Sequence, residues 1–316
     1  MTNHLELDCW DQLSSAERLG IARQLVRELP DGFSFDSVCE YRLDKTVHEI
    51  ASYRYGEASF ALVPGGSVEL GFDSATWTPT ADESASWSDT AEEYGLSGLI
   101  GAHVASATLR PRVVRVPPLL VERLAMELGW RSIAPGDPRV KKAAKSLGDA
   151  GSIQVHEGDS CVRVQRQEDG ALLAHEMLRL THADILKDML SSGGFRLPTS
   201  DEWEHLCGGG ARTLFRWGDH APSDCYPIDE SDWDLHRRPN AFGLEIAMDP
   251  YKYELTSEPS ISRGGDGGSM ICGGAGFFVG WLTLATAYFE PDVLRREPLA
   301  TVDVGYTIAR RVLPLR

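Results

Sequence analysis

The six cysteines, at positions 9, 39, 161, 207, 225 and 272, are the residues of this sequence with the widest chemical range. Thiolates bind soft metal ions and attack electrophiles. No two of these cysteines have C-x-x-C spacing, which argues against a zinc ribbon or a thioredoxin-type redox pair. Cys272 stands apart because it ends a glycine-rich run, Gly267-Gly268-Ser269-Met270-Ile271-Cys272. An unreactive, buried thiol remains the alternative interpretation for this residue.

Nucleotide-binding and hydrolase motifs are missing from the sequence. Asp266 lies between two glycine pairs, but no Gly-Lys-Ser/Thr follows it, so this run is not a P-loop. Gly65-Gly66 lies between expected strands and not before a helix, so it is not a dinucleotide fingerprint. No Gly-x-Ser-x-Gly elbow occurs in a strand-to-helix context. The sequence therefore predicts no nucleotide cofactor.

Six sequence blocks are more informative by their order than by their individual content. They occupy residues 60–71, 195–204, 215–219, 240–244, 263–272 and 304–306. In this order they resemble the formylglycine-generating enzyme family, the sulfatase-modifying factor group, over roughly residues 56–316. The resemblance implies an α+β protein with the complex C-type-lectin-like fold of that family, rich in loops and low in regular secondary structure.

The resemblance makes Cys272 the candidate catalytic and copper-binding residue. In the family, a Gly-Gly-Ser-x-x-Cys block supplies one of two cysteines that hold Cu(I) and engage the substrate cysteine, and residues 267–272 match it. Cu(I) is a soft ion that favours two thiolates. The second family cysteine corresponds to Phe277 here, and one thiolate cannot form the site unless Met270 or another cysteine replaces it.

Other metal sites of the family are altered in this sequence. The resemblance would place Asn240 and Glu254 at a calcium site, but the block at 249–255 has changed and contains Lys252. Calcium needs six to eight oxygen ligands, so these changes argue against it. The iron-dependent branch uses an H-x-x-x-H-x-E pattern, which no pair among the nine histidines shows.

The pocket at Cys272 is predicted to be formed by Ser269, Met270, Phe277 and Trp281, and residues 273–281 are apolar. Two hypotheses from different functional classes follow. One hypothesis is an O₂-dependent metal oxidoreductase with altered chemistry that acts on a cysteine, thiol or peptide substrate. The alternative is a catalytically inactive lectin-like scaffold that binds a protein or a small ligand. An open groove with a second soft ligand would favour the enzyme.

Several elements must position these residues. Thr199 and Glu202 predict a capping box that begins a helix extending to about Cys207. The other predicted helices cover 9–28, 119–128 and 182–190, the last capped by Thr181. Residues 73–100 are predicted to be a surface loop with at most one short helix around 90–94. A hairpin is predicted over 60–70 through Pro64-Gly65-Gly66. After Gly208 the sequence predicts almost no helix, with short strands over 268–272, 282–288 and 304–312.

Composition sets the remaining limits. The net charge is −16, from 47 acidic and 31 basic residues, which makes nucleic acid and anionic membranes poor partners. No apolar run reaches the eighteen or so residues of a membrane helix. The N-terminus has no secretory signal pattern, so a cytoplasmic protein is expected. Two regions are predicted: an N-terminal helical and strand extension, 1–55, and the family-like domain, 56–316.

Overall fold

The computed structural model describes residues 2–148, 151–157, 160–289 and 301–315. Within these ranges the chain is a mixed α+β protein with several small sheets. This confirms the predicted α+β class. None of the helices in the described part of the chain is both long and apolar enough to cross a bilayer.

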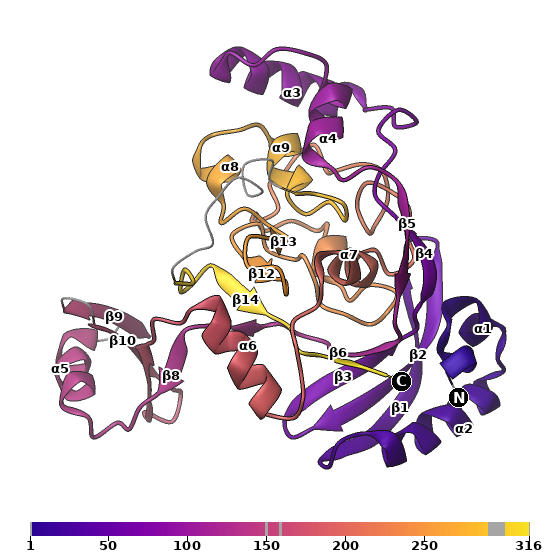
Figure 1. Cartoon of the computed structure of the whole chain (residues 1–316). Helices are drawn as coiled ribbons and strands as arrows, with labels where there is room; N and C mark the ends of the chain where they lie inside the picture. The colour runs from indigo at the N-terminus through magenta and orange to yellow at the C-terminus, as the bar shows by residue number, and fades with distance from the viewer. Residues whose placement is uncertain (1, 149–150, 158–159, 290–300, 316) are drawn as a thin grey trace.

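A five-stranded antiparallel sheet forms the base of the molecule, with strand order β1-β2-β3-β6-β15 (Figure 1). Its strands are β1 (Phe33–Leu43), β2 (Thr46–Tyr55), β3 (Ala58–Val63), β6 (Leu119–Glu122) and β15 (Val312–Pro314). Tyr55 pairs with Ala58 across the predicted boundary at residue 55. Strands from both predicted regions therefore share one sheet, and the two-region division stays a prediction.

The predicted helix 9–28 is divided into two. The N-terminal segment contains η1 (Thr2–Leu5), α1 (Leu7–Gln12), α2 (Ser15–Leu25) and η2 (Val26–Glu28). Ser14 and Glu17 form a capping box, which begins α2 and separates it from α1. The aromatic ring of Trp10 is buried between these helices and β2, where its indole N–H donates to Glu49 O at 2.7 Å.

The hairpin predicted over 60–70 is wrong, because β3 and β4 (Gly66–Leu70) do not pair. Strand β3 lies between β2 and β6, and β4 pairs with β5 (Arg112–Val116) in a separate two-stranded sheet. Gly65 accepts Leu7 N–H and donates to Leu5 O instead of closing a turn. A Cβ on Gly65 would lie 2.4 Å from Pro117 C, so glycine is needed for this close backbone passage.

Residues 73–100 are not predominantly loop, because they contain a long helix, α3 (Ala81–Tyr94), followed by α4 (Ile100–Ala107). Thr80 and Glu83 form the capping box of α3, and Gly95 ends it at φ 62°. These two local signals set the start and the end of the helix, although its composition is polar. In Figure 1 the α3–α4 pair projects from one end of the molecule.

The helix predicted over 119–128 is wrong as well. Leu119–Glu122 is strand β6, fully buried between β3 and β15, and β7 (Met126–Glu127) follows it. A short, continuous apolar run suits a buried strand as well as a buried helix, so the pattern alone cannot distinguish them.

Residues 130–177 form a small lobe with its own hydrophobic cluster. The elements of the lobe are β8 (Trp130–Ser132), α5 (Pro138–Leu147), β9 (Ser152–Glu157), β10 (Ser160–Arg166) and β11 (Leu172–Met177). The strands form a sheet of order β8-β11-β10-β9, on which α5 packs through Val140, Ala143 and Leu147. Figure 1 shows the lobe at one side of the molecule, before α6 (His182–Ser191).

The C-terminal part is rich in loops, as predicted, with short elements around α7 (Ser200–Gly208). These are η3 (Leu235–Arg237), β12 (Tyr253–Leu255), β13 (Ser262–Arg263), α8 (Ser269–Cys272), α9 (Phe277–Leu282) and β14 (Thr307–Ala309). The strand predicted over 268–272 is wrong: the Asp266 carboxylate accepts Gly268 N–H and Met270 N–H and starts the single turn α8. Residues 283–287 form turns and a bend instead of a strand, and Tyr288 makes only an isolated antiparallel bridge with Thr108.

Candidate functional site

Helix α7 begins as its sequence predicts. Thr199 Oγ1 accepts Glu202 N–H at 3.1 Å, and Glu202 accepts Thr199 N–H at 2.8 Å. Arg196 adds two hydrogen bonds to the Glu202 carboxylate, at 2.6 and 2.7 Å. The capping box is therefore also an ion pair, which fixes the entry of α7 against the preceding chain.

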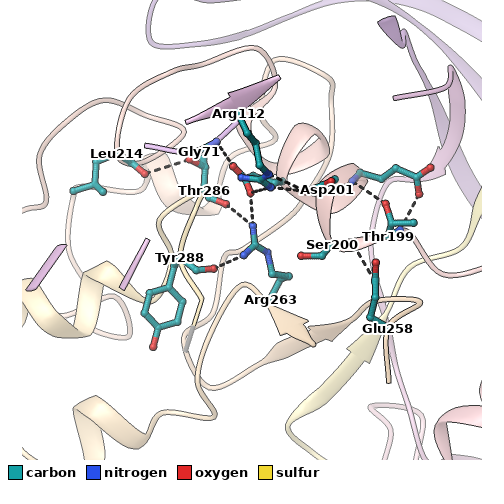
Figure 2. Close-up of polar contacts among 12 residues, drawn as sticks. Gly71, Arg112, Thr199, Ser200, Asp201, Leu214, Glu258, Arg263, Thr286 and Tyr288 are labelled. Carbon is teal, nitrogen blue, oxygen red and sulfur yellow. Dashed lines mark hydrogen bonds and ion pairs between the residues drawn. The ribbon is translucent and has the colours of Figure 1, made fainter. Parts of the chain in front are cut away.

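Glu204, two residues after Glu202 on α7, is the centre of a network of charges. Figure 2 shows its partners Arg112 and Arg263. Its Oε2 accepts from Arg263 Nη2 at 2.7 Å and from Arg112 Nη2 at 2.8 Å. Arg263 also donates to Tyr288 O at 2.8 Å, and Asp201 accepts from Arg112. The network joins α7, β5, β13 and the 286–288 turn. The Arg112 side chain is partly buried in this network.

These groups neutralise one another, so the network stabilises the scaffold. Burial lowers the pKa of Arg263, and the adjacent Glu204 carboxylate opposes that shift. Two arginines face two carboxylates, leaving no excess charge for a ligand. A buried pair of this kind holds its members in place because separating them would leave an unpaired charge in the interior.

The resemblance places Glu254 and Asn240 at a calcium site, but in the structure their side chains make other contacts. Glu254 Oε1 accepts from Arg310 Nε at 2.8 Å, and both side chains are buried. The Asn240 amide donates to Leu206 O and Cys207 O, while its Oδ1 accepts Phe242 N–H and Leu244 N–H. Their oxygens bind protein donors, and an arginine lies beside Glu254. These two residues do not fit a calcium site.

Cys272 is exposed at the end of α8, and its nearest polar partner is a phenol. Cys272 Sγ lies 3.2 Å from Tyr251 Oη. This hydrogen bond raises the pKa of Tyr251. All six cysteines are free thiols. Ser269 Oγ donates to Asp266 O at 2.9 Å, and Met270 packs partly buried against the main core. Among the described residues, no three His, Cys, Asp or Glu side chains gather as metal ligands.

The remaining predicted pocket residues lie elsewhere. Trp281 is fully buried, and its indole N–H donates to Cys225 O at 2.9 Å. It packs edge-on against His236, with ring centroids 4.9 Å apart, inside a cluster that includes Trp217 and Trp233. Phe277 is half-buried and lines a different pocket, described below. The structure therefore does not unite Cys272, Phe277 and Trp281 in one site.

A pocket of about 700 Å³ lies beside Cys272, and we call it the Tyr251 pocket. Tyr251 lines it and also contacts the Cys272 thiol. The other lining residues are Pro227, Ile228, Arg237, Met248, Asp249, Pro250, Lys252, Gly305 and Tyr306. The sequence prediction missed this set. Its one signal was the altered block at 249–255, which was interpreted only as a change in a calcium site.

A second pocket, of about 460 Å³, lies between α3 and the start of α9, and we call it the α3 pocket. Its lining residues are Asp82, Ala85, Ser86, Asp89, Ser223, Tyr226, Gly276 and Phe277. Tyr226 lines the α3 pocket and the next residue, Pro227, lines the Tyr251 pocket. Both pockets therefore adjoin the Tyr226–Pro227 segment.

Comparisons with known proteins give no assignment. No protein-family model matches the chain. A search of curated proteins also finds no match. The function is therefore inferred from the geometry of the two pockets and of Cys272.

Proposed function

We propose that this chain is a catalytically inactive binding protein, built on the lectin-like scaffold of the formylglycine-generating enzyme family. Its ligand is an extended peptide segment of a protein partner, and its binding site is the Tyr251 pocket. The observation that favours this function is the lining of that pocket: exposed aromatic and apolar side chains gather there, next to a thiol whose polar neighbour is a phenol.

Two features support the scaffold. The Thr199 capping box precedes a helix whose Glu204 holds separate loops together, and the chain after Gly208 has only short elements between long connections. Loops held by buried ion pairs on a small frame provide a surface that can vary in sequence without loss of the fold.

The walls of the Tyr251 pocket are connected directly to each other. Tyr253 N–H donates to Tyr306 O at 2.9 Å, and Tyr253 Oη donates to Asp303 at 2.8 Å. The Lys252 ammonium donates to Gly305 O. These bonds fix segment 251–253 against segment 303–306, so the pocket exists before a ligand arrives. A preformed site loses less conformational entropy on binding.

The chemistry of the lining suits a polypeptide. Tyr306 is 46% exposed and Ile228 is 43% exposed, although both are large apolar side chains. Tyrosine, methionine and arginine are enriched at protein interfaces relative to the rest of the surface. Tyr251, Met248 and Arg237 supply all three residue types here. Nucleic acid and anionic lipid are poor ligands for a chain of net charge −16.

The residues near Cys272 do not fit the family's copper site. That site uses two protein thiolates, and Cys272 has a tyrosine hydroxyl as its hydrogen-bond partner. A phenol is a harder ligand than a thiolate and does not favour Cu(I). The alternative function, O₂-dependent oxidation of a thiol or peptide, keeps one supporting observation, the exposure of the Cys272 thiol beside the pocket.

A Cu(I) titration against a competing chelator separates the two functions. We expect the parent protein and Cys272→Ala to bind Cu(I) with the same affinity, because no second thiolate assists Cys272. Tight one-to-one binding in the parent that is lost in Cys272→Ala would contradict the binding-protein proposal and restore the oxidase.

Binding itself is tested with a displayed library of random peptides. Selected peptides should lose about tenfold or more in affinity for Tyr306→Ser, since a central aromatic side chain contributes much of the energy of an interface. Leu173→Ser is the matched control, because Leu173 is 43% exposed on β11 in the lobe. Failure to select any peptide, or equal losses in both variants, would refute the proposed site.

A further inference from the structure

We propose that the α3 pocket is a second docking site, which receives a lysine- or arginine-rich segment of the same protein partner. This inference rests on the proposed binding function and specifies the chemistry of the partner. It depends on a separate set of residues from the Tyr251 pocket.

The acidic wall of the α3 pocket is one face of a single helix. Asp82, Ala85, Ser86 and Asp89 follow the i, i+3, i+4, i+7 spacing that places side chains on one side of α3. The carboxylates of Asp82 and Asp89 are exposed and have no hydrogen-bond or ion-pair partner among the described residues. These two carboxylates on the same face of α3 can therefore bind a cationic side chain without first breaking an existing contact.

Helix α3 is held rigidly to the opposite wall. Ser86 Oγ accepts the N–H of Phe278, in the first turn of α9, at 3.3 Å. Thr90 Oγ1 accepts the N–H of Gly276, just before α9, at 2.9 Å. The fully buried Glu83 carboxylate accepts Ala221 N–H at 3.0 Å and contacts His220 Nδ1 at 3.2 Å. The carboxylates at the pocket thus have a fixed spacing relative to the aromatic wall.

That opposite wall consists of Phe277 and Tyr226. Tyr226 Oη donates to Ala275 O at 3.1 Å, so its hydroxyl is occupied and its ring forms the surface. A cation between aromatic rings and carboxylates gains both the ion-pair and the cation–π interaction. Guanidinium groups suit such a site because they are planar, always charged and weakly hydrated.

The two stretches of sequence that line the pocket contain no lysine or arginine that would compete for the carboxylates. Residues 55–109 contain acidic residues at 57, 69, 73, 82, 83, 89, 92 and 93 and no lysine or arginine. Residues 217–236, on the other side of the pocket, contain acidic residues at 219, 224, 229, 230, 232 and 234 and again no lysine or arginine. The pocket lies between these two acidic stretches, so its field attracts a basic segment.

Because both pockets adjoin the Tyr226–Pro227 segment, one partner can occupy both. Since Tyr226 and Pro227 are consecutive, an extended segment that crosses them meets acidic and aromatic groups first and the Tyr251 pocket next. The partner therefore carries basic residues beside an apolar or aromatic stretch.

A labelled oligo-arginine peptide tests this inference, with an oligo-glutamate peptide of equal length as the ligand control. Binding is measured by fluorescence anisotropy to the parent, to Asp82→Asn/Asp89→Asn, and to Asp31→Asn/Asp188→Asn. The last pair changes the net charge equally, at exposed carboxylates outside the pocket. We expect about a tenfold loss of affinity only in the α3 pair, and weaker binding by the parent at high salt.

Equal weakening in both pairs would mean that general surface charge binds the peptide, which would overturn the inference. No binding by the parent would overturn it as well. Thermal unfolding of each variant verifies that it remains folded. Peptides selected at the Tyr251 pocket distinguish the two proposals: their loss of binding in Tyr306→Ser would persist if only the α3 pocket were misassigned.

Discussion

Glu204 shows how one buried side chain can determine the stability of a whole region of this scaffold. Its carboxylate is the common acceptor for Arg112 and Arg263, and the Arg263 side chain is fully buried. Replacement of one member leaves the other charge in the interior without a partner. The stability of the α7 region therefore depends on this carboxylate more than on any exposed ion pair nearby.

Glu204→Gln is expected to lower the free energy of unfolding by about 3–5 kcal/mol, the usual effect of breaking a buried ion pair. Asp201→Asn is the control, because Asp201 contacts the same arginine but its side chain is 47% exposed. An exposed pair contributes about 0–1 kcal/mol. Urea unfolding measures both, and equal losses would contradict the structural role given to Glu204.

His205 makes stability depend on pH. Burial lowers the pKa of His205 to about 4, and a hydrogen bond to Pro64 O fixes its ring. The unfolded value is about 6.5, so between the two values the unfolded chain binds more protons. Stability is thus complete above about pH 6.5 and is lost as the pH falls towards 4, by about 1.4 kcal/mol per pH unit for this group.

His205→Gln should remove that part of the pH dependence. Burial also lowers the pKa of His236 to about 4, so the variant keeps the share of the slope that His236 contributes. The measurement is the free energy of unfolding in urea at a series of pH values between 4 and 7. An unchanged slope would show that His205 is not the neutral, buried histidine described here.

At the scale of elements, α3 depends on its first residues. Thr80 and Glu83 form a capping box, and the same Glu83 carboxylate holds the 220–221 segment. Thr80→Ala should therefore cost about 1 kcal/mol of stability. Ser88→Ala in the exposed middle of α3 is the control and should be neutral or slightly stabilising, because alanine favours helix. Thermal unfolding of the two variants compares them, and a loss in Ser88→Ala as large as in Thr80→Ala would contradict this account.

Local signals in the sequence predicted some of these elements and missed others. The capping box at Thr199 identified α7 because its partners are three residues apart. The hairpin prediction over 60–70 was wrong because β3 and β4 pair with strands that are distant in sequence: β3 pairs with β6, and β4 pairs with β5. Polar composition alone does not reveal α3, because its start is set by the capping box of Thr80 and Glu83.

The candidate site was predicted only in part for the same reason. Cys272 was identified from its glycine-rich block, but Tyr251, its neighbour at 3.2 Å, is brought there by loop folding over 21 residues. Phe277 and Trp281 are five and nine positions after Cys272, yet α9 directs one to the α3 pocket and the other into the core. Sequence spacing does not define side-chain direction in a loop-rich segment.

At the scale of the whole molecule, the hydrophobic clusters divide the chain unequally. Two clusters fill the main body, and the third belongs to the lobe of residues 130–177. The ends of the lobe adjoin, because Leu178 N–H donates to Gly129 O at 2.7 Å. Arg163 and Glu127, 3.7 Å apart, form a partly exposed ion pair between the lobe and β7. The body therefore does not need the lobe for its own packing.

Replacement of residues 130–177 by a short glycine–serine turn should leave a body that unfolds cooperatively and binds the same selected peptides. The adjoining ends keep the entropy of closing the connection small, and the lost ion pair is worth about 0–1 kcal/mol. Removal of α3 and α4 instead should prevent folding, because Trp87, Ile100 and Val104 belong to the main core. Circular dichroism, urea unfolding and peptide binding compare the two deletions. A lobe deletion that fails to fold, or that folds without binding, would show that the lobe supports the body or the site in a way its separate cluster does not reveal.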